Sequence, residues 1–422
     1  MKKITTILIL FLAFNVFAQE KLSLQECYIS VEKNYPLAKQ NILLAKQNAF
    51  DLEVIKTKKL PEIDFAALAT YQSDVIGLPN STSNPGISSP NKDQYQATVT
   101  VDQLIYDGGL INASLAEESA SLKTDQKQVE VNLYQLKEQV NQYYFSILLL
   151  QEKGELLVAK KKELEATLKE VVAGVKYGTL LPNSDSVLEA ELLKIDQQLI
   201  ELDKDKMSYI KSLSELIGEN ISTSIKLDNP NISVNFETGI SRPELDLFQL
   251  KKDQIETSEL VIAKKNNPKL SAFATGGYGN PGLNMLDDSF SSYYIAGLKL
   301  KWNVFDWNST KKQRKSMQVN KEIIDTEQEV FELNTSIELT QQLSEINKMS
   351  EFIESDEKII DLRKKVLETS GSQLRNGVIT SSAYITELTN LYEAENNLKT
   401  HNIQLLFAKV NYNTVKGSKF NN

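Results

Sequence analysis

Few side chains in this sequence could do covalent or metal chemistry. His401 is the only histidine and Cys27 the only cysteine among 422 residues. The chain therefore cannot assemble a histidine-dependent triad, nor a metal cluster beyond an isolated pair of histidine and carboxylate. We expect His401 to be solvated, because it lies in the pattern of a polar helix. Cys27 follows Glu26, whereas lipid attachment favours small residues before the cysteine, and one cysteine allows no internal disulfide.

The residue types of one stretch match a nucleotide-binding motif. Gly277-Tyr-Gly-Asn-Pro-Gly282 has the spacing G-x-G-x-x-G, but that fingerprint needs a helix that opens on the glycines and receives phosphate. Pro281 and Gly282 predict a loop instead. The acids Glu163, Glu165, Glu189 and Glu191 are expected on helix exteriors or seams. We therefore expect no enzyme, no cofactor and no metal site.

Charge and the N-terminus exclude further classes. The formal net charge is −9, and no basic patch with interleaved aromatic residues is present, so nucleic acid is not an expected partner. Lys2, Lys3, the apolar residues 7–14 and Ala18 predict a secretory signal peptide over 1–18 and a mature start near Gln19, the alternative being a buried N-terminal strand. Removing both lysines gives −9 − 2 = −11. No later uncharged run approaches the roughly 20 residues of a spanning helix.

The sequence is predicted to be a duplication. Landmark residues recur at a constant offset of 207 before the strands and of 199 after them. Offsets this constant indicate two repeats, at 22–220 and 241–418, joined by a turn-rich linker at 219–240. The pairs are Pro36 and Pro243, Pro61 and Pro268, Asp107 and Asp306, Gly178 and Gly377, and Gly218 and Gly417.

Each repeat shows one order of predicted elements. A helix closed by proline (23–59; 244–266) precedes two strands, a helix of about 65 residues (109–175; 309–374), a glycine turn and a helix of about 35 residues. At 1.5 Å per residue the long helix would span roughly 100 Å, more than one globular core can use.

The long helices carry a coiled-coil period. From Leu133 to Val175 apolar residues recur at spacings of three and four, and only Gly154 and Lys161 interrupt the apolar set. A sustained period of 3.5 predicts a left-handed supercoil with neighbouring helices. The alternative is a simple antiparallel coiled-coil hairpin, from which nothing about function follows.

The predicted strands have one apolar and one polar face. Ile63, Phe65 and Tyr71 alternate with Glu62, Asp64 and Gln72, and the strand ending at Val101 behaves alike. In the second repeat, Leu298, Leu300 and Trp302 are backed by Lys299 and Lys301. This alternation is typical of a membrane β-barrel, whose lumen would receive Asp102, Lys299 and Lys301. A soluble two-sided sheet is the alternative.

Four strands cannot close a barrel alone. Open edges in lipid would leave roughly ten unpaired backbone groups, each costing several kcal/mol. We therefore expect strands from several copies to form one barrel. Two copies would give eight strands and a filled interior, and three would give twelve and an open lumen. Asp107 and Asp306 are expected to cap the helices that begin where the strands end, with Gly108 and Gly109 allowing the sharp turn.

These features together resemble the TolC-like outer membrane efflux protein family. The residues that carry the resemblance are Leu60-Pro61, the junction Leu104-Ile-Tyr-Asp-Gly-Gly109 with its partner Val304-Phe-Asp-Trp307, and the glycine turns followed by Val187-Leu-Glu-Ala190. The resemblance covers nearly the whole mature chain. It implies an α+β, mostly α fold with two tandem repeats, assembled as a homotrimer in the outer membrane. Twelve strands would form the barrel, continuous with a periplasmic barrel of long helices.

The resemblance also implies partners and a tip. A periplasmic adaptor (membrane fusion) protein would dock on the trimer and connect it to an inner-membrane transporter. The turns 176–185 and 375–382 would form the pump-facing tip. Family members often carry aspartate six positions after the turn glycine, whereas Asp185 comes one position late here and Ala383 takes the second site. The candidate tip and gate residues are Lys176, Tyr177, Gly178, Asp185, Arg375, Gly377 and Glu387.

We therefore expect a passive exit duct for efflux or type I secretion. The alternative is a periplasmic or surface coiled-coil protein without a membrane barrel. The loops 74–93 and 280–289 are expected to face the cell exterior, because long loops are usual on that side of outer membrane barrels.

Overall fold

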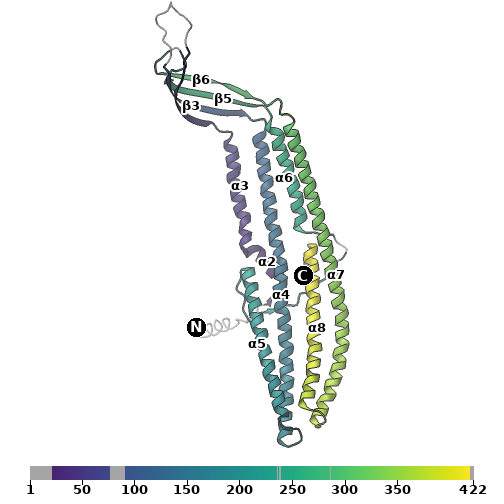
Figure 1. Ribbon diagram of the computed structural model, residues 1–422. Helices are drawn as coiled ribbons and strands as arrows, with labels where there is room; N and C mark the ends of the chain where they lie inside the picture. The colour runs from purple at the N-terminus through teal and green to yellow at the C-terminus, as the bar shows by residue number, and fades with distance from the viewer. Residues whose placement is uncertain (1–20, 77–90, 235, 237–238, 286, 419–422) are drawn as a thin grey trace, which may run out of the picture. The chain divides into compact units, whose positions relative to one another are not determined.

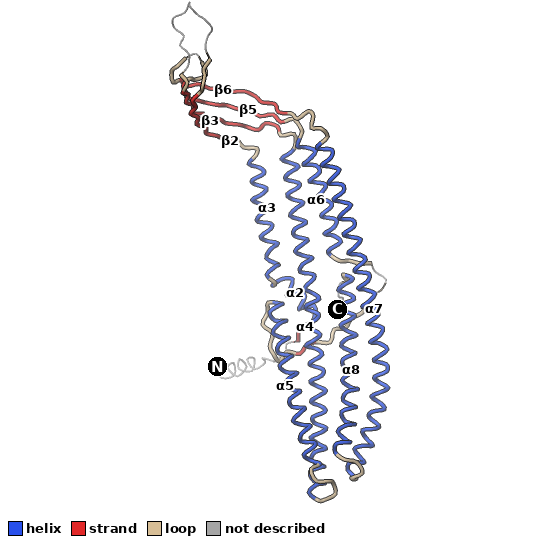
Figure 2. Tube along the Cα trace, in the orientation of Figure 1, coloured by secondary structure: helices blue, strands red, loops and turns tan. Residues whose placement is uncertain are grey.

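A computed structural model describes residues 21–76, 91–234, 236, 239–285 and 287–418. The predicted signal peptide and the centre of the loop 74–93 lie outside the described residues. Most of the described chain is helical (Figures 1 and 2). The elements are β1 (Lys21–Leu22), α2 (Leu24–Asn34), η1 (Pro36–Lys39), α3 (Gln40–Thr57), β2 (Glu62–Tyr71), β3 (Asp93–Tyr106), α4 (Leu110–Lys176), α5 (Ser184–Ile217), β4 (Lys226–Leu227), α6 (Pro243–Lys265), β5 (Lys269–Asn280), β6 (Ser291–Lys301), α7 (Ser309–Arg375) and α8 (Ser381–Lys416).

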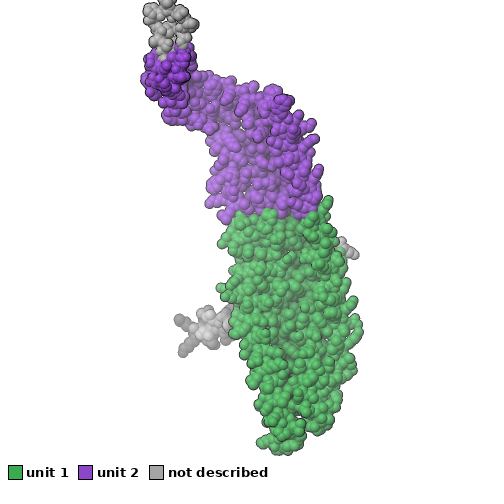
Figure 3. Space-filling view, viewed as in Figure 1, with its two compact units in different colours: residues 1–40, 128–245, 329–422 green, residues 41–127, 246–328 purple. Residues whose placement is uncertain are grey.

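The chain divides into two compact units, coloured separately in Figure 3. Unit 1 comprises residues 1–40, 128–245 and 329–422, and unit 2 comprises residues 41–127 and 246–328. The long helices α4 and α7 each have 67 residues and contribute to both units. None of the helices in the described ranges is long and apolar enough to cross a membrane.

The first predicted helix (23–59) is interrupted, so the expectation of one continuous helix is wrong. Ser23 opens α2 with a capping box, in which its side chain accepts from the Glu26 N–H and Glu26 accepts from the Ser23 N–H. Tyr35 then turns extended, with φ −61° and ψ 137°, before Pro36 starts η1. The cause is local, because the proline ring disfavours the helical region for the residue before it.

Unit 2 contains a four-stranded antiparallel sheet in the order β2-β3-β5-β6. Ile63 pairs with Val101, Val101 with Ala274, and Ala274 with Ala296, so apolar residues share one face. Glu62, Asp102 and Phe273 follow one another across the other face. The faces therefore alternate as the sequence predicts.

Nothing in the described part of the chain covers the apolar face of this sheet. Tyr294 is 83% exposed, Phe65 72% and Leu298 70%. The outer edges of β2 and β6 have no strand partner among the described residues. A sheet that belonged to a soluble single chain would bury one face against a second layer, and this sheet does not.

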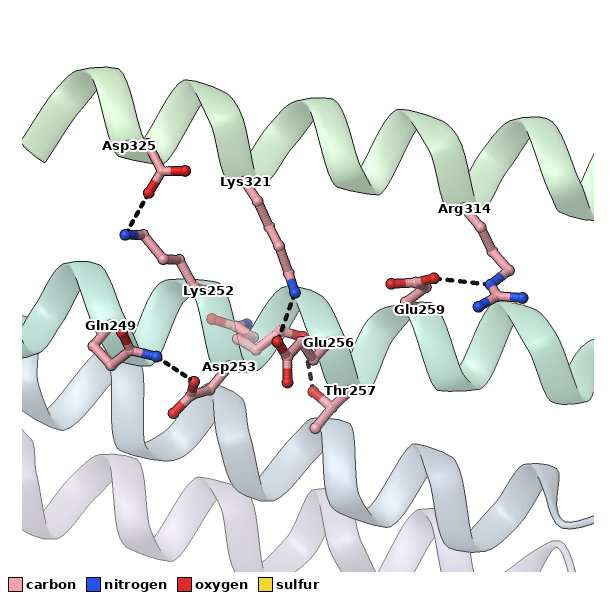
Figure 4. Close-up of polar contacts among 10 residues, drawn as sticks. Gln249, Lys252, Asp253, Glu256, Thr257, Glu259, Arg314, Lys321 and Asp325 are labelled. Carbon is pink, nitrogen blue, oxygen red and sulfur yellow. Dashed lines mark hydrogen bonds and ion pairs between the residues drawn. The ribbon is translucent and has the colours of Figure 1, made fainter.

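Ion pairs join α6 to α7 in unit 2 (Figure 4). Lys252 lies 2.5 Å from Asp325, Lys321 2.6 Å from Glu256, and Arg314 2.9 Å from Glu259. In the first repeat, the equivalent positions of α3 and α4, found by subtracting the offsets of 207 and 199, are largely apolar. These positions are Ala45, Ala49 and Leu52 in α3, and Leu115, Leu122 and Gln126 in α4. Partly exposed pairs of this kind contribute about 0–1 kcal/mol each, so these three pairs add only modestly to the stability of unit 2.

Unit 1 is built from two helical hairpins, α4 with α5 and α7 with α8. Apolar residues of all four helices form one cluster, which includes Leu164, Ile195, Leu367 and Leu388. A second cluster, which includes Cys27, Tyr144 and Leu213, joins α2 to α4 and α5.

Candidate functional site: the strand ends, the polar face and the hairpin turns

The strand-to-helix junctions place two carboxylates at the starts of the long helices. Asp107 accepts from the N–H of Gly109 at 2.9 Å and of Ile111 at 2.5 Å. Asp306 accepts from the N–H of Thr310 at 2.9 Å. Each carboxylate therefore satisfies N–H groups that the first helical turn leaves free.

These hydrogen bonds act on the carboxyl groups themselves. Burial alone would raise the pKa of Asp107, but the N–H groups of Ile111 and Gly109 hold that pKa below its usual value. The Thr310 hydroxyl and N–H, followed by other donors, lower the pKa of Asp306. Both junction carboxylates are therefore ionised at neutral pH and suit the positive end of the helix dipole.

The two junctions reach the same backbone turn with different residues. Gly108 and Gly109 have φ +71° and +86°, and Trp307 and Asn308, at the offset of 199, have φ 55° and 61°. A Cβ at Gly108 would overlap Asn267, whose side-chain amide donates to the Gly108 carbonyl at 2.7 Å. At Gly108 space therefore requires glycine, whereas the positive φ alone does not, because Trp307 and Asn308 adopt it in the second junction.

The predicted lumen residues lie on the polar face of the sheet but not on one rung. Asp102 pairs with Phe273, whereas Lys299 pairs with Ser271 and Lys301 with Lys269. The acidic residues Glu62, Asp64 and Asp102 belong to β2 and β3, and the lysines belong to β5 and β6. Charge on this face is therefore segregated by strand.

Both long helices end in the same glycine turn. Gly178 and Gly377 have φ +71° and +70°. Thr179 N–H donates to the Gly174 carbonyl at 2.8 Å, and Val378 N–H donates to the Gln373 carbonyl at 2.9 Å. These are Schellman closures, which need a left-handed residue just after the helix.

The two turns touch each other. A Cβ on Gly377 would lie 3.2 Å from the Thr179 carbonyl oxygen. A cavity of about 360 Å³ lies between the hairpins here, lined by Glu170, Leu180, Leu374, Arg375 and Tyr384, among others. The ends of the hairpins are thus in contact but do not fill the space between them.

The predicted tip charges are not brought together. Arg375 Nη1 lies 4.0 Å from Glu170 Oε2, and Glu387 Oε2 lies 3.5 Å from Arg363. Asp185 accepts from the N–H of Ser186 in its own helix at 2.9 Å. Lys176 lies near the exposed ring of Tyr177, 5.9 Å from its centre. Arg375 and Glu387 therefore belong to separate contacts.

Sequence reasoning missed the most buried charge between the hairpins. Lys160 Nζ donates to Glu191 Oε1 of α5 at 3.1 Å and to Thr389 Oγ1 of α8 at 3.4 Å. Its ammonium lies 4.9 Å from the centre of the Tyr392 ring. The side chain of Lys160 is 6% exposed. The one available signal was Lys161, which interrupts the apolar period beside it.

His401 is only partly solvated, because it also contacts a carboxylate of α7. Its Nδ1 lies 2.6 Å from Asp356 Oδ2 of α7, and its ring packs 5.1 Å from the Phe352 ring. Asp356 is buried. The polar pattern around His401 describes the exposed side of α8, whereas His401 lies on the side that contacts α7.

The G-x-G-x-x-G stretch is not a phosphate loop. Gly277 and Gly279 lie inside β5, and the next regular element after the loop is β6. No helix begins at these glycines, so the geometry that receives phosphate is absent from this stretch.

The chain has the fold of known outer membrane channels. The outer membrane protein VceC of Vibrio cholerae matches with a TM-score of 0.66 at 13% identity, over 94% of this chain and 97% of VceC. The Campylobacter jejuni CmeC outer membrane channel matches at 0.63 with 16% identity, over 93% of this chain and 85% of that one. The open state of the Neisseria gonorrhoeae MtrE outer membrane channel matches at 0.64 with 15% identity, over 94% and 89%. No curated protein sequence matches the chain.

One family profile matches part of the sequence. Residues 44–219 match the profile of the outer membrane efflux protein family. This match covers less than half of the chain and agrees with the resemblance to TolC-like outer membrane efflux proteins that the sequence shows.

Proposed function

We propose that the protein is the outer membrane exit duct of a tripartite efflux pump or a type I secretion system. The exposed apolar face of the four-stranded sheet carries this proposal. Side chains such as Phe65 and Tyr294 would be solvated at a cost of about 25 cal/mol per Å² in water, and nothing described in the chain covers them. Lipid would cover that face and leave Asp102, Lys299 and Lys301 towards a lumen. In a soluble coiled-coil protein the apolar face of this sheet would remain exposed to water.

The helices offer two different faces for assembly. Exposed apolar residues form a stripe along α7. Among them are Val330, Leu333 and Ile337, at spacings of three and four. Leu193, Ile200 and Met207 recur every seven residues on α5, which Figure 1 draws on the opposite side of unit 1 from α7. Joining one face to the other in the next copy is a heterologous contact, which closes into a ring when the rotation between copies is a whole fraction of a turn. Three copies would supply twelve strands, and we propose a homotrimer.

The glycine turns are proposed as the docking end. The turns at Gly178 and Gly377 lie together and leave the cavity between the hairpins. We propose that a periplasmic adaptor binds here and links the duct to an inner-membrane transporter. The helices would then lie in the periplasm and the barrel in the outer membrane.

Ion selectivity tests the proposed function directly. Reconstituted in planar bilayers, the protein is expected to form channels. Changing Lys299→Glu together with Lys301→Glu should shift the reversal potential towards cation selectivity, because charges that line a pore set its selectivity. Lys311→Glu with Lys312→Glu, in α7 beyond the strand, is the matched control. Failure of the unsubstituted protein to form channels would reject the duct, and loss of assembly in the β6 variant would show that these lysines pack against protein.

The tip is expected to respond to Arg375. Arg375→Glu would set a second carboxylate beside Glu170 and replace a weak, exposed attraction by repulsion. The expected result is a higher open probability in bilayers, or loss of efflux through failed docking, with the trimer intact. Adding Glu170→Arg to Arg375→Glu restores the opposite charges and should reverse the effect. Unchanged conductance and unchanged efflux would remove Arg375 from the gate.

A further inference from the structure

Two aromatic rings lie on the polar face of the sheet, each over a glycine of the neighbouring strand. Tyr293 of β6 pairs with Gly277 of β5, and a Cβ at Gly277 would overlap the tyrosine ring. Phe273 of β5 pairs with Gly297 of β6, where a Cβ would lie 3.1 Å from the phenylalanine ring. The arrangement is reciprocal, because each strand contributes one ring and one glycine.

Polar groups surround these rings. Gln96 donates its side-chain N–H to the Tyr293 hydroxyl. The rung between the two rings holds Thr275 and, opposite it, Ile295. The Thr275 hydroxyl lies 3.0 Å from that of Thr100. Lys299 lies two residues beyond Gly297 and therefore on the same face. The rings thus lie on the face that carries hydroxyl, amide and ammonium groups, with Ile295 as the apolar residue between them.

Lipid does not account for the two rings. Their neighbour Tyr294 has the opposite parity and is 83% exposed on the apolar face, where a lipid contact would be favourable. Tyr293 and Phe273 are both partly exposed, since each covers a glycine with one side of its ring. The other side is open towards the polar face. An open ring beside hydrogen-bond donors and an ammonium can stack with a planar aromatic group and hold its polar or anionic substituent.

We propose that Tyr293 and Phe273 are two successive stacking positions along the lumen for the aromatic part of a planar, anionic solute. The site rests on the proposed function, which makes the polar face a lumen. Glycine at 277 and 297 lets each ring lie flat against the sheet. Lys299, two residues beyond Gly297, supplies the cation beside Phe273, and Gln96 fixes the hydroxyl of Tyr293. This gives an otherwise passive duct a weak preference among the solutes that pass.

Channel block by two matched anions tests the site. Benzenesulfonate and cyclohexanesulfonate carry the same charge and the same ring size, but only the first is planar and aromatic. Benzenesulfonate is expected to reduce the current of the reconstituted channel at a concentration about two- to tenfold lower than cyclohexanesulfonate does. Tyr293→Leu and Phe273→Leu should each shrink this ratio towards one, and Tyr293→Phe should retain it.

Tyr294→Leu is the matched control, because it removes the same ring from the opposite face and should leave the ratio unchanged. The stacking site is overturned if the unsubstituted channel shows no preference, if Tyr293→Leu and Phe273→Leu both retain it, or if Tyr294→Leu abolishes it equally. Channels without a preference reject the stacking site alone. An unsubstituted protein that forms no channel rejects the proposed function and the site with it.

Discussion

Replacing Leu333 and Ile337 by glutamate is expected to abolish the trimer while each protomer stays folded. Both side chains are exposed in the protomer, at 61% and 49%, so the substitutions remove little internal packing. In the proposed ring the same residues would be covered by the next copy. Each new carboxylate would then lose its water without a partner, at a cost of several kcal/mol. Because 1.4 kcal/mol is a factor of ten, trimer should fall by more than about tenfold.

Migration of membrane extracts with and without heating measures this outcome. The unsubstituted protein is expected to run as a heat-modifiable trimer and the double variant as a monomer with an unchanged helical circular dichroism spectrum. Ser336→Glu adds a carboxylate at an exposed position of α7 outside the apolar stripe, so it should assemble normally. Persistence of the trimer in the double variant would show that α7 does not form the subunit contact.

Glu191→Leu is expected to destabilise unit 1 more than any exposed ion pair could. The change would leave the Lys160 ammonium, only 6% exposed, without its carboxylate. Removing one partner of a buried pair costs about 3–5 kcal/mol, because the remaining charge stays buried. Replacing both groups together, Lys160→Met with Glu191→Leu, should recover most of that loss. The pair therefore determines how α4, α5 and α8 align more than how stable they are.

The neighbouring pair provides the control. Lys161 Nζ lies 2.6 Å from Asp196 Oδ1, but its side chain is 30% exposed and that of Asp196 44%. Asp196→Ala should therefore cost about 1 kcal/mol or less. The stability of the unsubstituted protein and of the three variants is measured from the loss of the helical circular dichroism signal on heating, under the same detergent conditions. Equal losses for Glu191→Leu and Asp196→Ala would contradict a special role for Lys160.

The elements and faces of this protein follow from its sequence, because their causes are local. The long helices predicted at 109–175 and 309–374 are observed at Leu110–Lys176 and Ser309–Arg375. The apolar period of 3.5 residues and the glycine that ends each long helix both depend only on residues close together in the sequence. Alternation likewise determined which residues share a face of each strand. The interruption at Pro36 was equally local, and a stricter reading of the proline would have found it.

Resemblance and physical argument reached the same class of protein by different routes. The outer edges of β2 and β6 have no strand partner among the described residues, and in lipid their backbone groups would need further strands as hydrogen-bond partners. The match to the outer membrane efflux protein profile covers residues 44–219. Neither route indicated the rings over Gly277 and Gly297. Those contacts depend on the register between β5 and β6, and a register is a pairing between distant segments.

The side-chain contacts between helices depend on tertiary packing. The apolar period placed Lys161 in the seam of α4, whereas the structure buries Lys160 and leaves Lys161 partly exposed. Successive helical residues point about 100° apart, so a small rotation of α4 against its neighbours exchanges one lysine for the other. Arg375 with Glu170, and His401 with Asp356, depend on the same rotation between helices far apart in the sequence. The order of residues limits which side chains can meet, and packing of the two hairpins selects the pairs that do.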